Sequence, residues 1–138
     1  MKYSENPNYA QYMNLYAAGN LAGAKKALLA CVADFANSGS SAQRADILQR
    51  IGGIDFELGD AESALRLYRE SEAVDPDSLL AVFYFAKFLA EKVRDFAAAK
   101  AKCDEVISRA TANPFPESEE DFASEEYVRM ATKLRESL

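Results

Sequence analysis

The chain has 138 residues, a formal net charge of −6 and a hydrophobic fraction of 49%. This length suits one domain, and the hydrophobic fraction is high enough to build a core, which argues against a disordered chain. The negative charge repels phosphate backbones, so we do not expect the chain to bind nucleic acid.

We expect neither a secretory leader nor a membrane span. Residues 1–7 lack the apolar stretch of a signal peptide, and no apolar run approaches the roughly 20 residues that cross a bilayer. Cys31 and Cys103 lie far apart inside apolar helical stretches. Buried thiols in a reducing compartment are the simplest interpretation, and a disulfide or sensor pair is the alternative. The expected location is the cytoplasm.

Apolar residues recur at helical spacing over nearly the whole chain, and hairpin signals are absent. The pattern predicts helices near 7–18, 21–36, 42–58, 61–74, 78–92, 96–111 and 119–136. Within successive pairs, the break between the two helices reads Gly19-Asn20, Gly59-Asp60 and Arg94-Asp95. The Asn or Asp can cap the second helix of the pair, and a preceding glycine can end the first. A recurrence of about 35 to 40 residues is typical of paired-helix solenoids.

Longer breaks separate the pairs. A polar loop at 37–41 follows the first pair, the segment 75–78 follows the second, and 113–116 follows the third. Pro76 stops the helix before it, and Asp77 or Ser78 is expected to cap the next one.

The last helix is predicted to begin at Ser118, because Asp121 three residues later resembles a capping box with Asp in place of Glu. Its apolar residues share one face, as the terminal cap of a solenoid requires. These residues are Tyr127, Met130, Ala131 and Leu134.

The segment 45–78 resembles a tetratricopeptide repeat. The family's large apolar positions, its small contact positions, its turn, its aromatic and its closing proline are matched in chain order by Leu48, Ile51, Gly52, Gly59, Asp60, Ala64, Tyr68, Ser71 and Pro76. Small side chains are needed where two helices cross closely. One departure is Asp55, where the family usually has a large tyrosine-like residue, and we expect Phe56 to fill that space.

Two further segments resemble the same repeat less closely. The segment 79–112 aligns after one extra residue in its turn, through Val82, Phe85, Ala86, Leu89, Ala99, Cys103 and Val106. The segment 5–38 aligns only at its turn and at Ala24, Leu28 and Cys31. The resemblance implies a single all-α domain over 1–138. It would be a right-handed superhelical array of three antiparallel helix pairs, closed by a capping helix at 119–136.

In this family the first helix of each pair lines a concave groove that holds a partner peptide or helix. The resemblance therefore implies that the partner-binding residues are Tyr9, Met13, Tyr16, Asp46, Gln49, Phe56, Leu80, Phe83, Tyr84 and Lys87.

Aromatic residues surround the helix expected at 78–92. Phe85 and Phe88 can face the core, but Phe83 and Tyr84 cannot both do so at 100° per residue. At least one of them should line the groove or pack under the flanking helices. Two interpretations follow: an aromatic binding trough, or a core covered by the terminal helix.

Catalysis is not expected. The chain has no histidine, which removes the commonest general base and metal ligand and excludes Ser–His and Cys–His nucleophiles. Two isolated cysteines cannot form a structural zinc site, and there is no phosphate-binding glycine loop. The sequence therefore predicts no metal, no cofactor and no enzymatic activity.

The leading hypothesis is a protein-binding module, an adaptor or chaperone-like protein that holds a peptide or amphipathic helix. An alternative is a small acidic inhibitor or immunity protein that neutralises a basic toxin or enzyme. A third is self-assembly, with Phe83 or Tyr84 buried in a homodimer. The strongest charge cluster is Glu117, Glu119, Glu120, Asp121, Glu125 and Glu126, which can dock a basic surface or stabilise a helix start.

Overall fold

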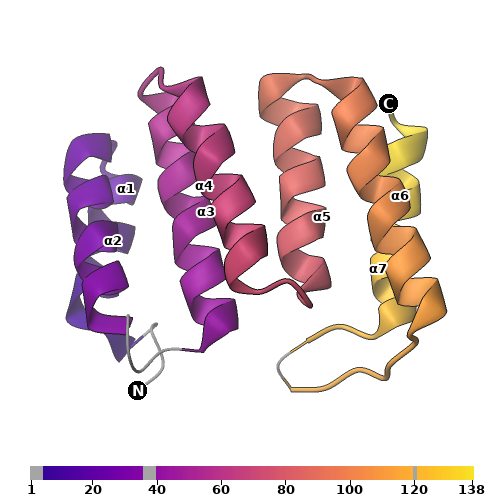
Figure 1. Cartoon of the computed structure of the whole chain (residues 1–138). Helices are drawn as coiled ribbons and strands as arrows, with labels where there is room; N and C mark the ends of the chain where they lie inside the picture. Colours follow the sequence, from indigo (N-terminus) through magenta and orange to yellow (C-terminus); the bar gives the residue numbers. More distant parts are fainter. Residues whose placement is uncertain (1–4, 36–39, 120) are drawn as a thin grey trace. The chain divides into compact units, whose positions relative to one another are not determined.

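The computed structural model describes residues 5–35, 40–119 and 121–138 (Figure 1). Within these ranges the protein is helical and has no strand, which confirms the all-α class. The chain divides into two compact units, Met1–Pro76 and Asp77–Leu138. The single domain over 1–138 and its superhelical arrangement stay predictions. None of the described helices is both long and apolar enough to cross a membrane.

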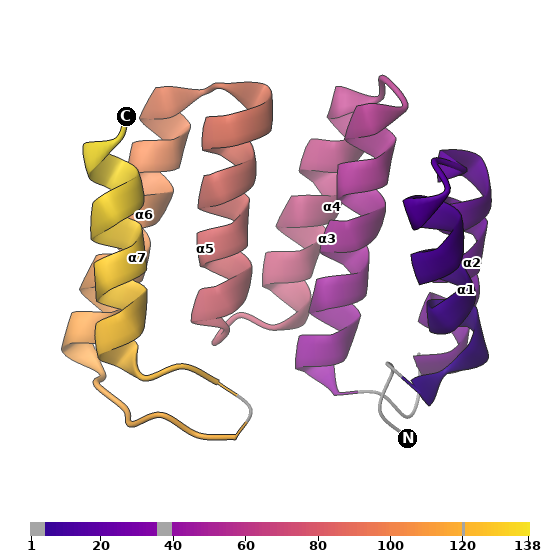
Figure 2. The ribbon, with the colours of Figure 1, turned by 180° about the vertical axis from the view of Figure 1, so that it is seen from behind.

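The described residues of the first unit form four helices in two antiparallel pairs. They are α1 (Pro7–Ala17), α2 (Leu21–Phe35), α3 (Ser41–Glu57) and α4 (Ala61–Val74). Figure 2 shows α1 in front of α2 and α3 in front of α4, so the first helices of the two pairs lie on the same side of this unit. The described bounds agree with the predicted ones to within one residue. Residue 36 of the predicted second helix and residues 37–39 of the polar loop lie outside the described residues.

The turns of the first unit form as predicted. Gly19 and Gly59 adopt left-handed conformations, with φ of 79° and 94°. The side-chain oxygen of Asn20 accepts a hydrogen bond from the backbone N–H of Gly23 at 2.9 Å, and Asp60 accepts one from Ser63 at 3.0 Å. Each glycine therefore ends one helix and each polar residue caps the next.

The small contact positions predicted from the repeat pattern are confirmed in α3 and α4. Gly52, Ala64 and Ser71 are buried, and the Ser71 hydroxyl donates to the carbonyl of Ala45 at 2.8 Å. The apolar core lies between the helix layers. It consists of Tyr12, Ala24, Ala27, Leu28, Cys31, Phe35, Ile47, Ile51 and Ile54.

The second unit contains α5 (Leu79–Phe88), a π-helical segment η2 (Leu89–Val93), α6 (Phe96–Ala112) and α7 (Ser124–Glu136). Of the two predicted caps for α5, Ser78 is the one that forms, since its hydroxyl oxygen accepts from the backbone N–H of Ala81 at 3.1 Å. Asp95 caps α6 in the same way, through Ala98 at 3.1 Å.

The π-helical segment contains the extra residue that the repeat pattern required. In the first unit, the backbone N–H groups of Asn20 and Asp60 bond to carbonyls five residues earlier. In the second unit, the equivalent N–H of Asp95 bonds to the carbonyl of Leu89, six residues earlier, at 3.0 Å. The additional residue widens the last helical turn. Arg94 then adopts the left-handed conformation that glycine adopts in the other two turns, with φ of 62°.

The structure shows which of Phe83 and Tyr84 is buried, a question that the sequence left open. Phe83 is only 9% exposed and belongs to the core of the second unit, packed with residues of α6 and α7. Tyr84 is 41% exposed. Phe85 and Phe88 are buried, as predicted. Phe83 is therefore a core residue, and Tyr84 is the surface residue of the pair.

The predicted start of the last helix is wrong. Ser118 does accept a hydrogen bond from the N–H of Asp121 at 3.1 Å, but the pair forms a local turn and α7 begins only at Ser124. The reason is a contact across the loop: the Ser124 hydroxyl oxygen accepts from the N–H of Phe115 at 2.9 Å, and the Ser124 N–H donates back to the Phe115 carbonyl at 3.0 Å. Residues 116–119 and 121–123 therefore belong to the loop before α7.

The rest of α7 agrees with the prediction. Tyr127 and Ala131 are fully buried against α5 and α6, with Met130 and Leu134 packed at the edge of the same core. Figure 2 shows α7 lying along α6. Phe115 and Phe122 both contact the ring of Tyr127, with centroids 6.3 and 5.9 Å away, so this tyrosine anchors the loop as well as the helix.

Candidate protein-interaction surface

Helix α1 presents an uncharged row of large side chains. Its start is set by Asn6, whose side-chain oxygen accepts from the N–H of Asn8 at 2.8 Å, and by Pro7 at the first turn. Tyr9, Met13 and Tyr16 then follow at spacings of four and three residues, which places them on one face. Met13 is 49% exposed and Tyr16 is 41% exposed. No charged residue occurs in Pro7–Ala17.

Helix α3 places a polar stripe beside this row. The helix begins with a capping box in which Ser40 and Gln43 bond to each other's backbone N–H groups. Asp46, Arg50, Gly53 and Glu57 follow at spacings of four, three and four, so they form one stripe along the helix. Asp46 and Arg50 are paired at 2.8 Å.

Side-chain contacts join the row and the stripe. The Arg50 guanidinium lies over the rings of Tyr9 and Tyr12, 5.7 and 6.0 Å from their centroids, and it donates to the Tyr12 hydroxyl at 3.4 Å. At the other end, the Tyr16 hydroxyl donates to Glu57 Oε1 at 2.6 Å. This hydrogen bond to a carboxylate raises the pKa of Tyr16 to about 12. We call the resulting surface the tyrosine face; its residues are Tyr9, Met13 and Tyr16 of α1 and Asp46, Arg50, Gly53 and Glu57 of α3.

Two neighbouring glycines of α3 have opposite surroundings. A Cβ added at Gly52 would lie 3.1 Å from the Tyr68 ring and 3.2 Å from the carbonyl oxygen of Ala64. A Cβ added at Gly53 would meet no other part of the described chain within 4 Å. Helix packing therefore accounts for the first glycine, while the second leaves open space in the middle of the tyrosine face.

Part of the predicted partner-binding set comes together on this face. Tyr9, Met13, Tyr16 and Asp46 belong to it, whereas Gln49 is buried and Phe56 is half-buried. In the second unit, Tyr84 and Lys87 are exposed, Leu80 is half-buried and Phe83 belongs to the core. Arg50 and Glu57 are missing from the predicted set. Their spacing from Asp46 along the helix was the available signal.

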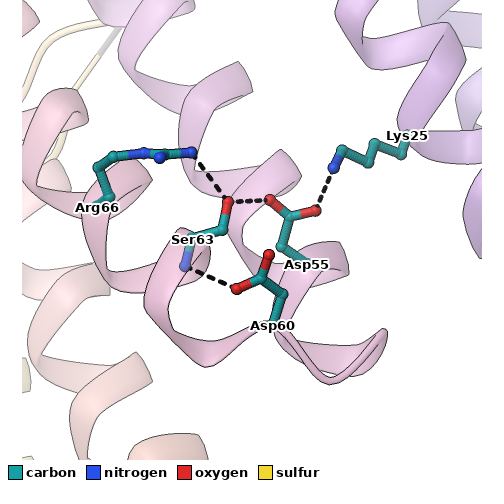
Figure 3. Close-up of polar contacts among 5 residues, drawn as sticks. All are labelled: Lys25, Asp55, Asp60, Ser63 and Arg66. Carbon is teal, nitrogen blue, oxygen red and sulfur yellow. Dashed lines mark hydrogen bonds and ion pairs between the residues drawn. The ribbon is translucent and has the colours of Figure 1, made fainter.

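A second feature of the first unit is a polar cluster around the buried Asp55, shown in Figure 3. Asp55 is only 2% exposed, and its carboxylate lies 2.6 Å from the Lys25 ammonium and accepts from the Ser63 hydroxyl at 2.7 Å. The Arg66 guanidinium donates to the same hydroxyl at 3.2 Å. These contacts tie α2, α3 and α4 together.

This cluster corrects the expectation that Phe56 would rotate into the space at Asp55. The carboxylate itself is buried, and Phe56 is half-buried. A buried carboxylate is tolerated here because Lys25 and Ser63 supply an opposite charge and a hydrogen-bond donor.

The two cysteines are buried and free, as predicted. Burial raises the pKa of the Cys31 thiol to about 11, and burial also raises the pKa of Cys103. Both thiols are therefore protonated at neutral pH, which makes them poor nucleophiles.

Some side chains of the acidic cluster around the start of α7 form contacts within the chain. The Tyr127 hydroxyl donates to Asp121, and Glu126 pairs with Arg129. Burial is the main cause that raises the pKa of Tyr127, followed by its bond to Asp121. Glu117, Glu119 and Glu125 are exposed, and Glu120 lies outside the described residues.

Among the residues that the structure describes, no three His, Cys, Asp or Glu side chains gather where they could hold a metal ion. Compared with known proteins, the sequence matches no family model and no curated protein.

Proposed function

We propose that the chain is a non-catalytic interaction module, adaptor-like or chaperone-like, whose tyrosine face holds a peptide or helix of a partner protein. In this proposal the helix pairs follow a tetratricopeptide-like superhelix, as the resemblance of 45–78 implies. The observation that carries the proposal is the uncharged row on α1, where Met13 and Tyr16 stay exposed beside the stripe of α3.

Several properties of the face support this role. Tyrosine and arginine are the side chains that contribute most to protein interfaces, and Tyr9, Tyr16 and Arg50 lie within one surface. The contacts of Arg50 and Glu57 hold these side chains in place before a partner arrives. A surface that is already ordered loses less conformational entropy on binding.

The test is a comparison of two single variants as baits in the source cell. Met13→Glu places a charge on the tyrosine face, whereas Leu29→Glu places the same charge at an equally exposed apolar residue of α2. We expect a specific partner to be captured by the wild type and by Leu29→Glu and to be lost with Met13→Glu. Circular dichroism of both variants confirms that they fold. Equal capture by both variants would refute the role of this face.

The exposed carboxylates of the α6–α7 loop and of the first turn of α7 favour the second candidate, an acidic inhibitor or immunity protein that neutralises a basic toxin or enzyme. In that case capture would weaken with salt and would be lost when Glu117, Glu119 and Glu125 are changed together to Gln. Met13→Glu would leave that capture intact. The two baits therefore separate the candidates.

A further inference from the structure

Packing within the described chain does not require a glycine at position 53. Glycine in a helix interior costs about 0.5–1 kcal/mol relative to alanine. At Gly52 this cost is offset by the close approach of Tyr68 and the Ala64 backbone. At Gly53 no atom from another part of the described chain lies within 4 Å of the missing side chain. Within the described chain, nothing fills the space over Gly53, so a side chain of a partner can enter the tyrosine face there.

The groups around that space have a defined chemistry. Arg50 precedes Gly53 by three residues on the stripe, and Glu57 follows it by four. Glu57 is exposed and holds the hydroxyl of Tyr16, so the 41% exposed Tyr16 side chain is fixed beside the carboxylate. A ring and a carboxylate side by side form a site for a cation, which the ring attracts through its face.

The net charge of the tyrosine face also favours a cationic ligand. Helix α1 contributes no charge, and the stripe on α3 contributes two carboxylates and one guanidinium. Asp46 and Arg50 are paired with each other, so the remaining negative charge lies on Glu57. The whole chain carries a net charge of −6, which steers basic partners toward it. An acidic segment would meet repulsion here.

The protein already contains an example of such a contact. The guanidinium of Arg50 stands over the rings of Tyr9 and Tyr12 while it is bonded to Asp46. Tyr16 and Glu57 repeat the combination of ring and carboxylate at the other end of the face, with open space over Gly53 where a second guanidinium can enter.

We propose that the partner segment is basic, and that one arginine side chain of it lies over Gly53, stacked on Tyr16 and paired with Glu57. This inference rests on the proposed function, since it names the chemistry of the segment that the tyrosine face holds. An apolar helix and an acidic segment are the competing occupants.

The experiment uses three helical peptides of a common alanine-, glutamine- and leucine-based sequence that differ only in the central residue: arginine, glutamine or glutamate. Binding to the isotope-labelled full chain is followed by NMR. We expect the arginine peptide to bind about threefold to thirtyfold more tightly than the glutamine peptide, the sum of one exposed cation–π contact and one exposed ion pair. Its largest shifts should be at the amides of Gly53 and Glu57.

Variants of the protein test whether Glu57 and the space over Gly53 form the arginine site. Glu57→Gln keeps an acceptor for the Tyr16 hydroxyl and removes the charge, so the preference for the arginine peptide should fall to the about twofold to fivefold that the cation–π contact with Tyr16 supplies alone. Glu62→Gln changes the net charge equally at an exposed residue of α4 and should keep the preference. Gly53→Leu fills the open space and should weaken the arginine peptide at least as much, with helicity checked by circular dichroism.

The other outcomes are decisive as well. Equal binding of the arginine and glutamine peptides at Gly53 would overturn the inference and leave the proposed function standing. Tightest binding of the glutamate peptide, or shifts confined to residues 115–126, would overturn it too. If no peptide shifts Gly53, the inference fails. The proposed function is then still judged separately by the Met13→Glu and Leu29→Glu baits.

Discussion

At the scale of single residues, Gly52 and Gly53 differ although they are neighbours in α3. One backbone faces the Tyr68 ring and the other faces open space. The same substitution should therefore have opposite effects on stability at the two positions. At Gly52 the added methyl group would crowd its neighbours and destabilise the fold, whereas at Gly53 it would meet no neighbour and only the higher helix propensity of the new residue would matter.

We expect Gly52→Ala to lower the free energy of unfolding by about 1–3 kcal/mol, since the new methyl group forces Tyr68 or α4 to move. Gly53→Ala should raise it by about 0.5–1 kcal/mol, the difference in helix propensity. Urea unfolding followed by circular dichroism measures both. A loss of stability in Gly53→Ala would contradict the open environment of that residue.

Asp55 is the buried charge on which the contacts among α2, α3 and α4 converge. Asp55→Ala leaves the Ser63 hydroxyl without its acceptor and Lys25 without its counter-ion. We expect a loss of about 1–3 kcal/mol in the free energy of unfolding, because the Ser63 hydroxyl loses its acceptor while the remaining charge, on Lys25, stays partly exposed to solvent. Glu62→Ala, at an exposed residue of α4, should change stability by less than about 0.5 kcal/mol in the same urea experiment.

Tyr16 provides a test based on pH. Its pKa is raised from 10.0 to about 12 by the bond to Glu57, so the folded protein keeps a proton that the unfolded chain releases. This contribution to stability is complete below pH 10 and is lost as the pH rises from 10 to about 12. Tyr16→Phe should remove this part of the pH dependence of unfolding, while Glu62→Gln should retain it. Glu57→Gln should move the pKa of Tyr16 back toward 10, read from its phenolate absorbance.

At the scale of elements, three turns end the first helix of a pair in the left-handed conformation, two of them with glycine and one with arginine. Gly19 and Gly59 end α1 and α3 in the left-handed conformation, whereas η2 ends with Arg94 in that conformation. A non-glycine residue pays a steric cost there, and Arg94 retains its side chain over the ring of Phe96, 5.3 Å from the centroid.

Replacing Arg94 separates backbone strain from side-chain contact. Arg94→Gly and Arg94→Ala both remove the contact with Phe96, but only glycine relieves the left-handed backbone. We expect Arg94→Gly to be more stable than Arg94→Ala by about 1 kcal/mol in thermal or urea unfolding. Equal stability of the two variants would show that the turn relaxes to a right-handed conformation.

The starts of the helices were predicted correctly where the sequence signal lies within a few residues of the helix end. Asn20, Asp60, Ser78 and Asp95 cap helices through backbone N–H groups three residues away, and these caps could be predicted from the sequence. The start of α7 could not. Ser118 and Asp121 carry the local signal of a helix start, but the bonds between Phe115 and Ser124 span nine residues and prevail over it.

At the scale of the whole molecule, the two units have separate cores. The residues packed around Leu28 come from α1, α2 and α3, and those packed around Tyr127 come from α5, α6 and α7. In arrays of helix pairs, stability is close to a sum of local contributions.

We therefore expect core substitutions to act mainly within their own unit. Tyr127→Ala should cost about 3–5 kcal/mol and speed amide hydrogen exchange in α5, α6 and α7 more than in α1 to α4. Leu28→Ala, at a cost of about 2–5 kcal/mol, should produce the reverse pattern. Equal acceleration throughout by either variant would show that the chain unfolds as one cooperative unit.

The candidate site was predictable in part. The resemblance to tetratricopeptide repeats implied Tyr9, Met13, Tyr16 and Asp46 as partner-binding residues, and helical spacing explains why the first three share one face of α1. Helical spacing could not show that Phe83 is buried while Tyr84 is exposed, because both residues lie on the same helix and only the packing of other helices distinguishes them.

The sequence by itself determined the all-α class, the pairing signals, the caps and the small residues of the helix contacts, since each depends on spacing within a few turns. Only the tertiary structure decided that Asp55 is buried with Lys25 and Ser63, that Arg50 stands over Tyr9 and Tyr12, and that Gly53 faces open space. These features depend on side chains brought together from different helices, and neither periodicity nor propensity contains that information.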